Sequence, residues 1–282
     1  MAEDLQSYCA PGTTVTVREV SPGPEVTLRC HDFVPERPLP EPVFFIPGWI
    51  SRMAGWKIVL RDMTRTRRVL YLETREKNSA RVPDRFSFGA TALATDLVRA
   101  AEALELDPPH TIWFGSSLGA TAILEAMQFL PRKPRALVLV GPNAEFRIPW
   151  WGRGIIAVFP VPLWRLFKPF VKWYLRTFRL DVEKDRAQYE KYCAALDEAN
   201  PLRLKKGARE LAHYTVWDRL PQIDIPVLIF GGSHDVLHEP ANLVKMTERL
   251  PRAVYRDLET NTNTHSEIMV REMEQFLADL EK

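Results

Sequence analysis

The sequence predicts an α/β protein with a mostly parallel, doubly wound sheet and an added helical segment. Short runs rich in β-branched and aromatic residues recur along the chain, and they have the character of buried strands. Segments with apolar residues at helical spacing lie between them, and such alternation is typical of a parallel sheet covered on both faces. The length of 282 residues allows one large domain with an insertion.

Composition and charge are those of a globular protein, with 46% hydrophobic residues and a net charge of +2. The polar N-terminus, residues 1–4, lacks the features of a secretory signal, and no stretch of 18 apolar residues occurs. Cys9 and Cys30 fall in neighbouring segments and could pair, but with Cys193 they form neither an even disulfide framework nor a metal-binding spacing. We expect a cytoplasmic protein with reduced thiols and no bound metal.

The N-terminal part is predicted to form a pair of antiparallel strands with Ser21–Pro24 as the turn between them. A proline-rich linker follows. The charged segment 73–77 after the fourth strand is predicted to be a solvated rim without a role in the chemistry. A helix is predicted over 88–104 from its apolar stripe. The strands expected before this helix are 13–20, 25–33, 43–46 and 68–72.

The segment Gly115-Ser116-Ser117-Leu118-Gly119 lies between a predicted strand, 111–114, and a predicted helix, 120–130. A Gly-x-Ser-x-Gly in this context is the nucleophile elbow. Its turn is so tight that the central serine takes a strained backbone conformation, and the glycines are needed for their lack of bulk. The positive end of the following helix faces the same point. Ser117 is therefore the predicted nucleophile.

A small-residue turn is the plain alternative, because the bare pattern occurs by chance in about one chain of this length in ten. The strand-then-helix context favours catalysis over that alternative. Ser116 and Ser233 are rival serines, but Ser116 occupies the elbow position that points away from the apex.

Candidate partners of Ser117 follow it in the chain order that the elbow motif requires. Asp235 comes just after a predicted strand, 227–230, and His265 precedes an amphipathic run, 268–280. A serine hydroxyl is a poor nucleophile at neutral pH, so an imidazole must take its proton. A carboxylate must hold that imidazole in the right tautomer.

Plainer roles for these two residues stay open. Asp235 could cap the helix that begins near Pro240, and His265 could lie beside the N-cap of the last helix. Among the six histidines, His238 is the rival base, and Glu145, after the strand expected at 137–140, is the rival acid.

With these elements in place, the chain resembles an α/β-hydrolase-fold serine hydrolase of the esterase or lipase type, over nearly its whole length apart from the middle insertion. The resemblance implies a catalytic triad of Ser117 as nucleophile, Asp235 as acid and His265 as base. It also implies an oxyanion hole made by the backbone N–H groups of Trp49 and Leu118.

The loop that follows the strand at 43–46 departs from the family pattern. The family usually has His-Gly-x here, whereas this chain has Pro47-Gly48-Trp49. A backbone donor survives the change, so we expect a working oxyanion hole whose entrance is shaped by Trp49.

Residues 143–220 form the insertion, at the place where the family carries its cap, and residues 1–142 and 221–282 form the core domain. The insertion has 15 Lys and Arg against 9 Asp and Glu, whereas the rest of the chain has 23 against 27. Within it, residues 148–180 contain no acidic residue, six Lys and Arg, and nine aromatic residues.

Three interpretations of this basic, aromatic segment compete. In the plainest, a cap helix packs its aromatic face over the active site and turns its cations outward. In the second, the helix rests on a membrane of anionic lipid. Binding of nucleic acid is the third, and a near-neutral net charge with no nucleic-acid motif disfavours it. The residues expected to contact substrate are Trp49, Ser116, Phe167, Phe170 and Tyr174.

The predicted function is that of a cofactor-free serine hydrolase, which cleaves a carboxylic ester with an apolar, lipid-like or aromatic group through an acyl-enzyme. Acyl transfer, thioester hydrolysis and C–C bond hydrolysis use the same triad and stay open. The rival from another class is a receptor without catalytic activity, which would bind an apolar ligand beneath the cap.

Overall fold

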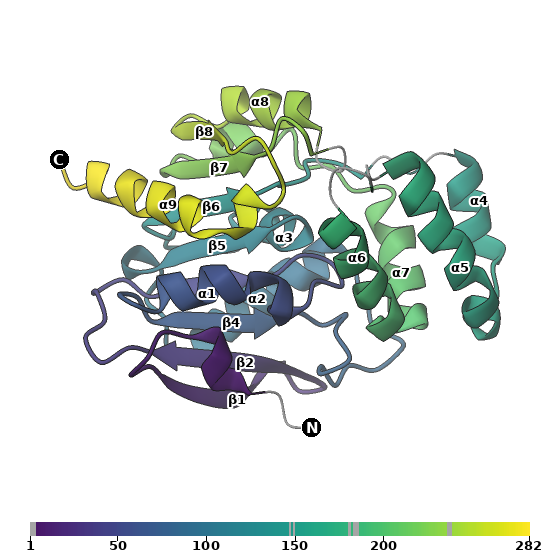
Figure 1. Ribbon diagram of the computed structural model, residues 1–282, viewed down its shortest axis with the longest axis horizontal. Helices are drawn as coiled ribbons and strands as arrows, with labels where there is room; N and C mark the ends of the chain where they lie inside the picture. Colours follow the sequence, from purple (N-terminus) through teal and green to yellow (C-terminus); the bar gives the residue numbers. More distant parts are fainter. Residues whose placement is uncertain (1–3, 147, 149, 180–181, 183–185, 236–238) are drawn as a thin grey trace.

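The computed structural model describes residues 4–146, 148, 150–179, 182, 186–235 and 239–282. Within these ranges eight strands form one sheet in the order β1-β2-β4-β3-β5-β6-β7-β8 (Figure 1). β2 pairs antiparallel with β1 and β4, and the remaining pairs are parallel, which confirms the predicted fold class. The strands are β1 (Thr14–Gly23), β2 (Val26–Val34), β3 (Val43–Ile46), β4 (Val69–Glu73), β5 (Ile112–Ser116), β6 (Ala136–Val140), β7 (Val227–Gly231) and β8 (Ala253–Asp257).

Helices cover both faces of the sheet and bury a separate apolar cluster on each. β5 illustrates the arrangement, because successive side chains of a strand point to opposite faces. Trp113 belongs to the cluster beneath α2 and α3, whereas Ile112 and Phe114 belong to the cluster beneath α1 and α9. The helices packed on the sheet are α1 (Lys57–Met63), α2 (Ala90–Ala103), α3 (Leu118–Ala126), α8 (Pro240–Arg249) and α9 (Glu267–Asp279).

The cysteines are free thiols, and the two that could have paired lie apart. Cys9 is buried in the cluster beneath α1 and α9, and Cys30 in the cluster on the opposite face of the sheet. Burial raises the pKa of Cys30 to about 12, so its thiol stays protonated at neutral pH.

The first hairpin turns later than the sequence predicts. β1 continues through Pro22 to Gly23, with a register irregularity between Val20 and Gly23, and the turn lies at residues 24–25. Pro22 is tolerated because β1 is the edge strand of the sheet and Pro22 lies in the irregularity, where it has no register partner in β2.

The segment after β4, predicted to be a solvated rim, is instead largely buried. Arg75 donates two hydrogen bonds of 2.6 Å to the carboxylate of Asp96 on α2. Arg203, from the insertion, donates to the carbonyl oxygens of Arg75 and Ala80 at 3.2 and 3.1 Å. The prediction was wrong because the insertion covers a charged segment that the sequence alone would leave in water.

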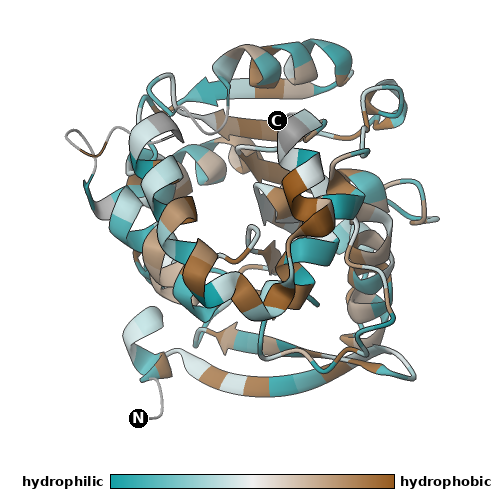
Figure 2. Ribbon diagram, turned by 90° about the vertical axis from the view of Figure 1, so that its right-hand side faces the viewer, coloured by the Kyte–Doolittle hydropathy of each residue, from teal (hydrophilic) through white to brown (hydrophobic). Residues whose placement is uncertain are grey.

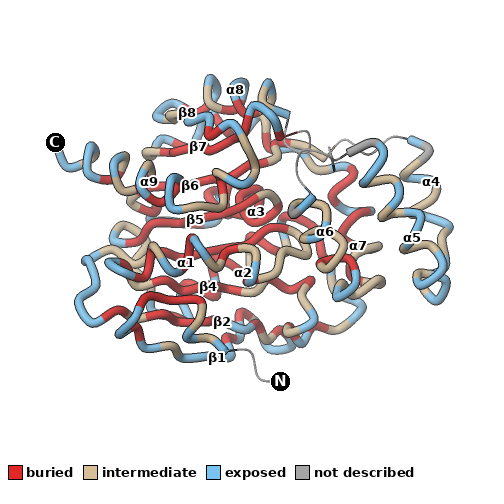
Figure 3. The backbone as a smooth tube through the Cα atoms, viewed as in Figure 1, coloured by how far each residue is buried: buried red, intermediate tan, exposed pale blue. Residues whose placement is uncertain are grey.

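The helical insertion, residues 143–220, lies between β6 and β7 in the chain, and its helices gather at one end of the sheet (Figures 1 and 3). Its described helices are α4 (Trp150–Val158), α5 (Trp164–Tyr174), α6 (Arg186–Glu198) and α7 (Pro201–Leu211). A short 3-10 turn, η4 (Val161–Leu163), joins α4 to α5, and a π-helical turn, η5 (Leu175–Arg179), follows α5.

Candidate active site

Ser117 occupies the sharp turn between β5 and α3 that the motif predicts. Its backbone has φ 48° and ψ −116°, a strained conformation for a residue other than glycine. A Cβ atom at Gly115 would lie 2.7 Å from the backbone N and Cα atoms of Ala120. Only glycine therefore fits two residues before the serine, because the helix turns back directly over this position.

Two more glycines, which have no side chain, allow the turn to lie directly against the loop that follows β3. A Cβ atom at Gly119 would lie 2.3 Å from the carbonyl oxygen of Ile46 and 2.5 Å from that of Pro47. A Cβ atom at Gly48 would lie 3.2 Å from the Cβ atom of Ser117. The Gly48–Trp49 peptide is therefore held beside the serine.

The structure brings Ser117, Asp235 and His265 to the wall of one cavity of about 70 Å³. They reach it from the ends of β5, β7 and β8, which run parallel in the same part of the sheet. Asp235 is buried, and His265 ends a 3-10 turn, η7 (Asn263–His265). Trp49 and Ser116 line the same cavity.

Asn261, which sequence reasoning missed, contacts both the Asp235 carboxylate and the His265 imidazole. Its Nδ2 donates to Oδ2 of Asp235 at 3.1 Å, and its carbonyl oxygen lies 2.9 Å from Nδ1 of His265. A carbonyl oxygen can only accept, so Nδ1 carries the proton and Nε2 keeps its lone pair. This is the tautomer that a general base requires. The polar run before His265 is the signal in the sequence that could have indicated Asn261.

An indole ring fixes the plane of the His265 imidazole. The ring of Trp56 lies with its centroid 4.1 Å away at an interplanar angle of 33°. Trp56 is itself fully buried, and its Nε1 donates to Oγ of Ser51 at 3.1 Å. The imidazole is thus held by a ring on one side and by backbone at Nδ1.

The structure also shows where the rival residues lie and which residues cap the two helices. Glu239, and not Asp235, is the N-cap residue of α8, whereas His265 does precede the N-cap of α9, Ser266. Ser233 is exposed, and its N–H donates to Asp257. Glu145 lines a larger cavity and not the small one. His238 lies outside the described residues.

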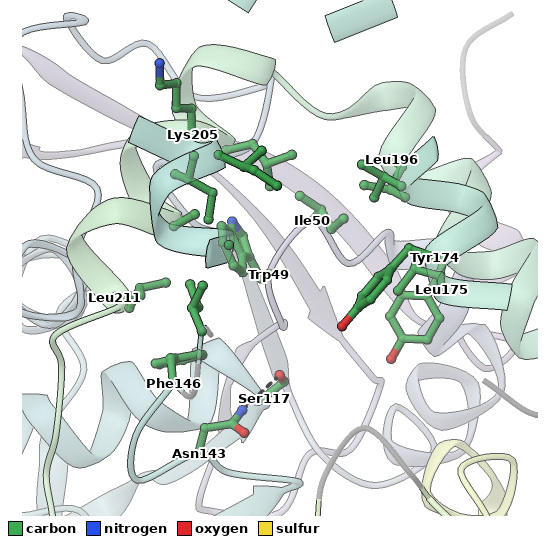
Figure 4. Close-up of a pocket in the computed structure, with 18 of the residues that line it drawn as sticks. Trp49, Ile50, Ser117, Asn143, Phe146, Tyr174, Leu175, Leu196, Lys205 and Leu211 are labelled. Atoms are coloured by element: carbon green, nitrogen blue, oxygen red, sulfur yellow. Dashed lines mark hydrogen bonds between the residues drawn. The ribbon is translucent and has the colours of Figure 1, made fainter. Parts of the chain in front are cut away.

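Asn143, a second residue that sequence reasoning missed, contacts the serine directly. Its Nδ2 lies 3.4 Å from Oγ of Ser117 (Figure 4). The hydroxyl of Thr121 donates to the carbonyl oxygen of Asn143 at 2.9 Å, which links the loop after β6 to the first turns of α3. An amide donor therefore stands beside the hydroxyl.

Lys77 holds the peptide that we expected to supply an oxyanion donor. Its Nζ donates to the carbonyl oxygen of Gly48 at 2.7 Å, and its side chain is only 11% exposed. In a trans peptide the C=O and N–H bonds point in opposite directions, so this contact directs the N–H of Trp49 away from Lys77. Burial lowers the pKa of Lys77 from its ordinary value of 10.5.

A larger cavity of about 640 Å³ adjoins Ser117 and is lined mainly by apolar side chains of the insertion (Figure 4). Phe167, Phe170 and Tyr174 line it, as does Trp49. Within the described chain there is no group of three or more side chains arranged to hold a metal ion.

The expectation that the cations of α5 face outward holds for Arg165, which is exposed, but is wrong for its two lysines. Lys168 and Lys172 contact the carboxylate of Asp197 on α6 at 3.2 and 2.8 Å, and their side chains are 21% and 26% exposed. The exposed face carries Leu166, Phe170 and other apolar residues. The sequence alone could not indicate the orientation of the two lysines, because it depends on a carboxylate of a neighbouring helix.

Comparison with known proteins identifies a family and a shared fold. Residues 43–276 match the family model described as the alpha/beta hydrolase family. No curated protein matches the sequence. Among solved structures, an esterase from Thermogutta terrifontis is 17% identical with a TM-score of 0.78, and the alignment covers 95% of this chain and 100% of the other.

Two further structures have the same fold and other named activities. An enol-lactonase from Burkholderia xenovorans LB400 is 15% identical with a TM-score of 0.73. A bromoperoxidase from Bacillus anthracis is 15% identical with a TM-score of 0.74. Each alignment covers 93% of this chain and 100% of the other. At such identities the likeness establishes the fold, and the chemistry must be argued from the site.

Proposed function

The chain belongs to the alpha/beta hydrolase family, and on this premise we propose that it is a serine hydrolase that cleaves a carboxylic ester with an apolar group. One observation carries the proposal. Three groups line a single cavity: a serine in a strained elbow, a buried carboxylate, and an imidazole held in the basic tautomer. Structural roles alone give no reason for these three groups to share a cavity.

In the proposed mechanism Oγ of Ser117 attacks the ester carbonyl carbon while Nε2 of His265 takes the hydroxyl proton. The N–H groups of Trp49 and Leu118 stabilise the oxyanion, and Leu118 can donate because the first N–H groups of a helix have no partner within it. The alcohol leaves with the proton from His265. Water, deprotonated by His265, then attacks the acyl-enzyme and releases the carboxylic acid.

The larger cavity supports an apolar substrate group. Its walls are mainly aliphatic and aromatic, and Ser117 lies at its edge (Figure 4). Burial of each methylene contributes about 0.8 kcal/mol, so a long acyl or alkyl chain would gain affinity there. In this proposal residues 143–220 act as a cap over the core formed by residues 1–142 and 221–282.

Labelling with a fluorophosphonate tests the function directly. An activated serine forms a covalent adduct, and peptide mapping by mass spectrometry should place the adduct on Ser117. Denatured protein is the control, because it lacks the arranged base and should stay unlabelled. A folded protein that resists labelling would favour the rival, a receptor for an apolar ligand.

Replacing Ile156 with Trp should shift substrate preference toward short esters. Ile156 lines the larger cavity, so the indole fills space that two or three methylenes would occupy. With p-nitrophenyl esters of four to ten carbons, we expect kcat/KM to fall about tenfold or more for the longest and to change little for the shortest. Ala157→Trp is the matched control, since Ala157 is exposed on the same helix. Equal losses at every chain length would contradict the assignment.

Replacing Lys77 with Met should lower kcat by about 10- to 100-fold and leave KM nearly unchanged. The contact with Gly48 orients a donor whose interaction is strongest with the transition-state oxyanion. Lys77→Arg keeps a cation at this position and should restore part of the rate.

The pH profile separates this positioning role from a merely structural one. Burial lowers the pKa of Lys77, so its charge is lost as pH rises through values below 10.5. The wild-type rate should therefore fall in that alkaline range, whereas Lys77→Arg should hold its rate to higher pH. Identical alkaline limbs in the two proteins would contradict the role of Lys77.

A further inference from the structure

The outer side of the insertion presents an unusual concentration of apolar side chains. Among the described residues, half of the large hydrophobic side chains that are exposed lie within residues 150–173. The others are scattered over the rest of the chain. The six are Trp150, Val158, Leu163, Leu166, Phe170 and Trp173, with exposed fractions from 45% to 84%. We call them the apolar face.

The spacing of these residues places most of them on one side of a helix. Leu163, Leu166, Phe170 and Trp173 recur at steps of three and four along η4 and α5. α4 and α5 stand at the right-hand end of the molecule in Figure 1, and hydrophobic segments run along them where they face the viewer in Figure 2. Exposed apolar surface of this kind marks an interaction site.

Charge indicates the kind of partner. Arg153, Arg165 and Arg176 are exposed on the same helices and on η5. Residues 148–180 contain no Asp or Glu, so no carboxylate of this segment opposes an approaching anion. Aromatic residues combined with arginines suit the boundary between acyl chains and phosphate headgroups.

The large cavity reaches this surface. Phe170 lines the cavity and is also 46% exposed, and Val171 and Tyr174 line the inner side of the same helix. A molecule that leaves an apolar phase at α5 would therefore enter the cavity that Ser117 lines.

We propose that the apolar face docks on an anionic lipid bilayer, with Arg165 and Arg176 at the phosphates, so that an ester lipid passes from the bilayer into the cavity. The docking stands by itself, and the delivery of substrate rests on the proposed hydrolase function. No single described helix has the length and hydropathy to span a membrane, but 152–158 and 161–177 reach that threshold as a pair bent by 109°. Such a bend suits helices that lie in the interface.

Co-sedimentation with vesicles tests the docking. Wild-type protein should bind phosphatidylcholine vesicles that contain phosphatidylglycerol, and bind pure phosphatidylcholine vesicles more weakly. Arg165→Gln and Arg176→Gln should each weaken binding to the anionic vesicles about fivefold and hardly change binding to the neutral ones. The double variant Leu166→Ser, Trp173→Ser should weaken binding to both by about tenfold or more.

Matched controls lie on the body of the protein. Phe129→Ser and Arg132→Gln also change an exposed apolar residue and an exposed cation, and neither should alter binding. Leu166 and Trp173 are not among the residues that line the large cavity, so hydrolysis of a soluble short-chain ester should stay at the wild-type rate in the double variant.

Three results would overturn the docking proposal: no binding to anionic vesicles, binding that neither set of variants weakens, or a wild-type dimer that the double variant converts to monomer. The last would assign the apolar face to a second copy of the chain. Labelling of Ser117 without vesicle binding would refute docking alone, whereas vesicle binding without labelling would refute the hydrolase proposal alone.

Discussion

Replacing Ser117 with Ala should lower kcat for ester hydrolysis by about 10⁵-fold, because the proposed reaction then loses its nucleophile while its donors and base remain in place. The folded structure should persist, since alanine keeps the Cβ atom of serine and φ 48° strains both residue types similarly. We also expect fluorophosphonate labelling to disappear. The melting temperature and circular dichroism should match those of the wild type.

Ser233→Ala is the matched control for this change. Ser233 is the rival serine, two residues before Asp235. It is exposed, and its backbone N–H, which the substitution keeps, donates to Asp257. Its replacement should leave both rate and labelling unchanged. If Ser117→Ala retained the wild-type rate, the nucleophile would be another residue and the proposed mechanism would fail.

Replacing Gly119 with Ala should destabilise the protein by about 3 kcal/mol and also lower kcat. The new methyl group would meet two backbone carbonyl oxygens, Ile46 and Pro47, at 2.3 and 2.5 Å. Backbone cannot turn away as a flexible side chain can, so α3 and the loop after β3 must move apart. That movement carries the Gly48–Trp49 peptide away from Ser117. Losing one oxyanion donor typically lowers kcat by about 10²- to 10³-fold.

The same substitution at Gly154 should have the opposite effect on stability. Gly154 lies inside α4, and a Cβ atom there would meet nothing within 4 Å. Alanine favours a helix interior over glycine by about 1 kcal/mol, so Gly154→Ala should raise the free energy of unfolding slightly. Urea denaturation of both variants would measure the contrast. Equal effects at the two positions would mean that the close approach at Gly119 is absent.

Most of the sheet could be predicted because its central strands are continuous apolar runs. β3, β5, β6 and β7 are buried on both faces, and their sequences consist almost entirely of apolar residues. β8 was not predicted, since Ala253–Asp257 is only partly buried and mixes charged with apolar residues at the edge of the sheet. α1 was missed as well, because it spans only seven residues.

The residues proposed for catalysis were predicted, whereas those that position them were not. Ser117, Asp235 and His265 each follow a strand, and the carboxyl ends of parallel strands meet at one edge of a sheet. Asn261, Asn143 and Lys77 carry no such mark, because they act through hydrogen bonds formed by loops. Their partners are known only once those loops are folded.

The sequence by itself determined the order of most strands and helices, the glycine-flanked turn and the basic, aromatic character of residues 143–220. These features depend on the local spacing and the volume of side chains, which are the same whatever the tertiary structure. Tertiary structure decided which charges are buried and which faces are exposed. Lys77 lies against Gly48, and Lys172 against Asp197, because distant segments bring their oxygen atoms to those lysines. The free energy gained when a charged side chain is buried and paired depends on neighbours that are remote in the sequence. The sequence alone therefore could not predict which charges are buried.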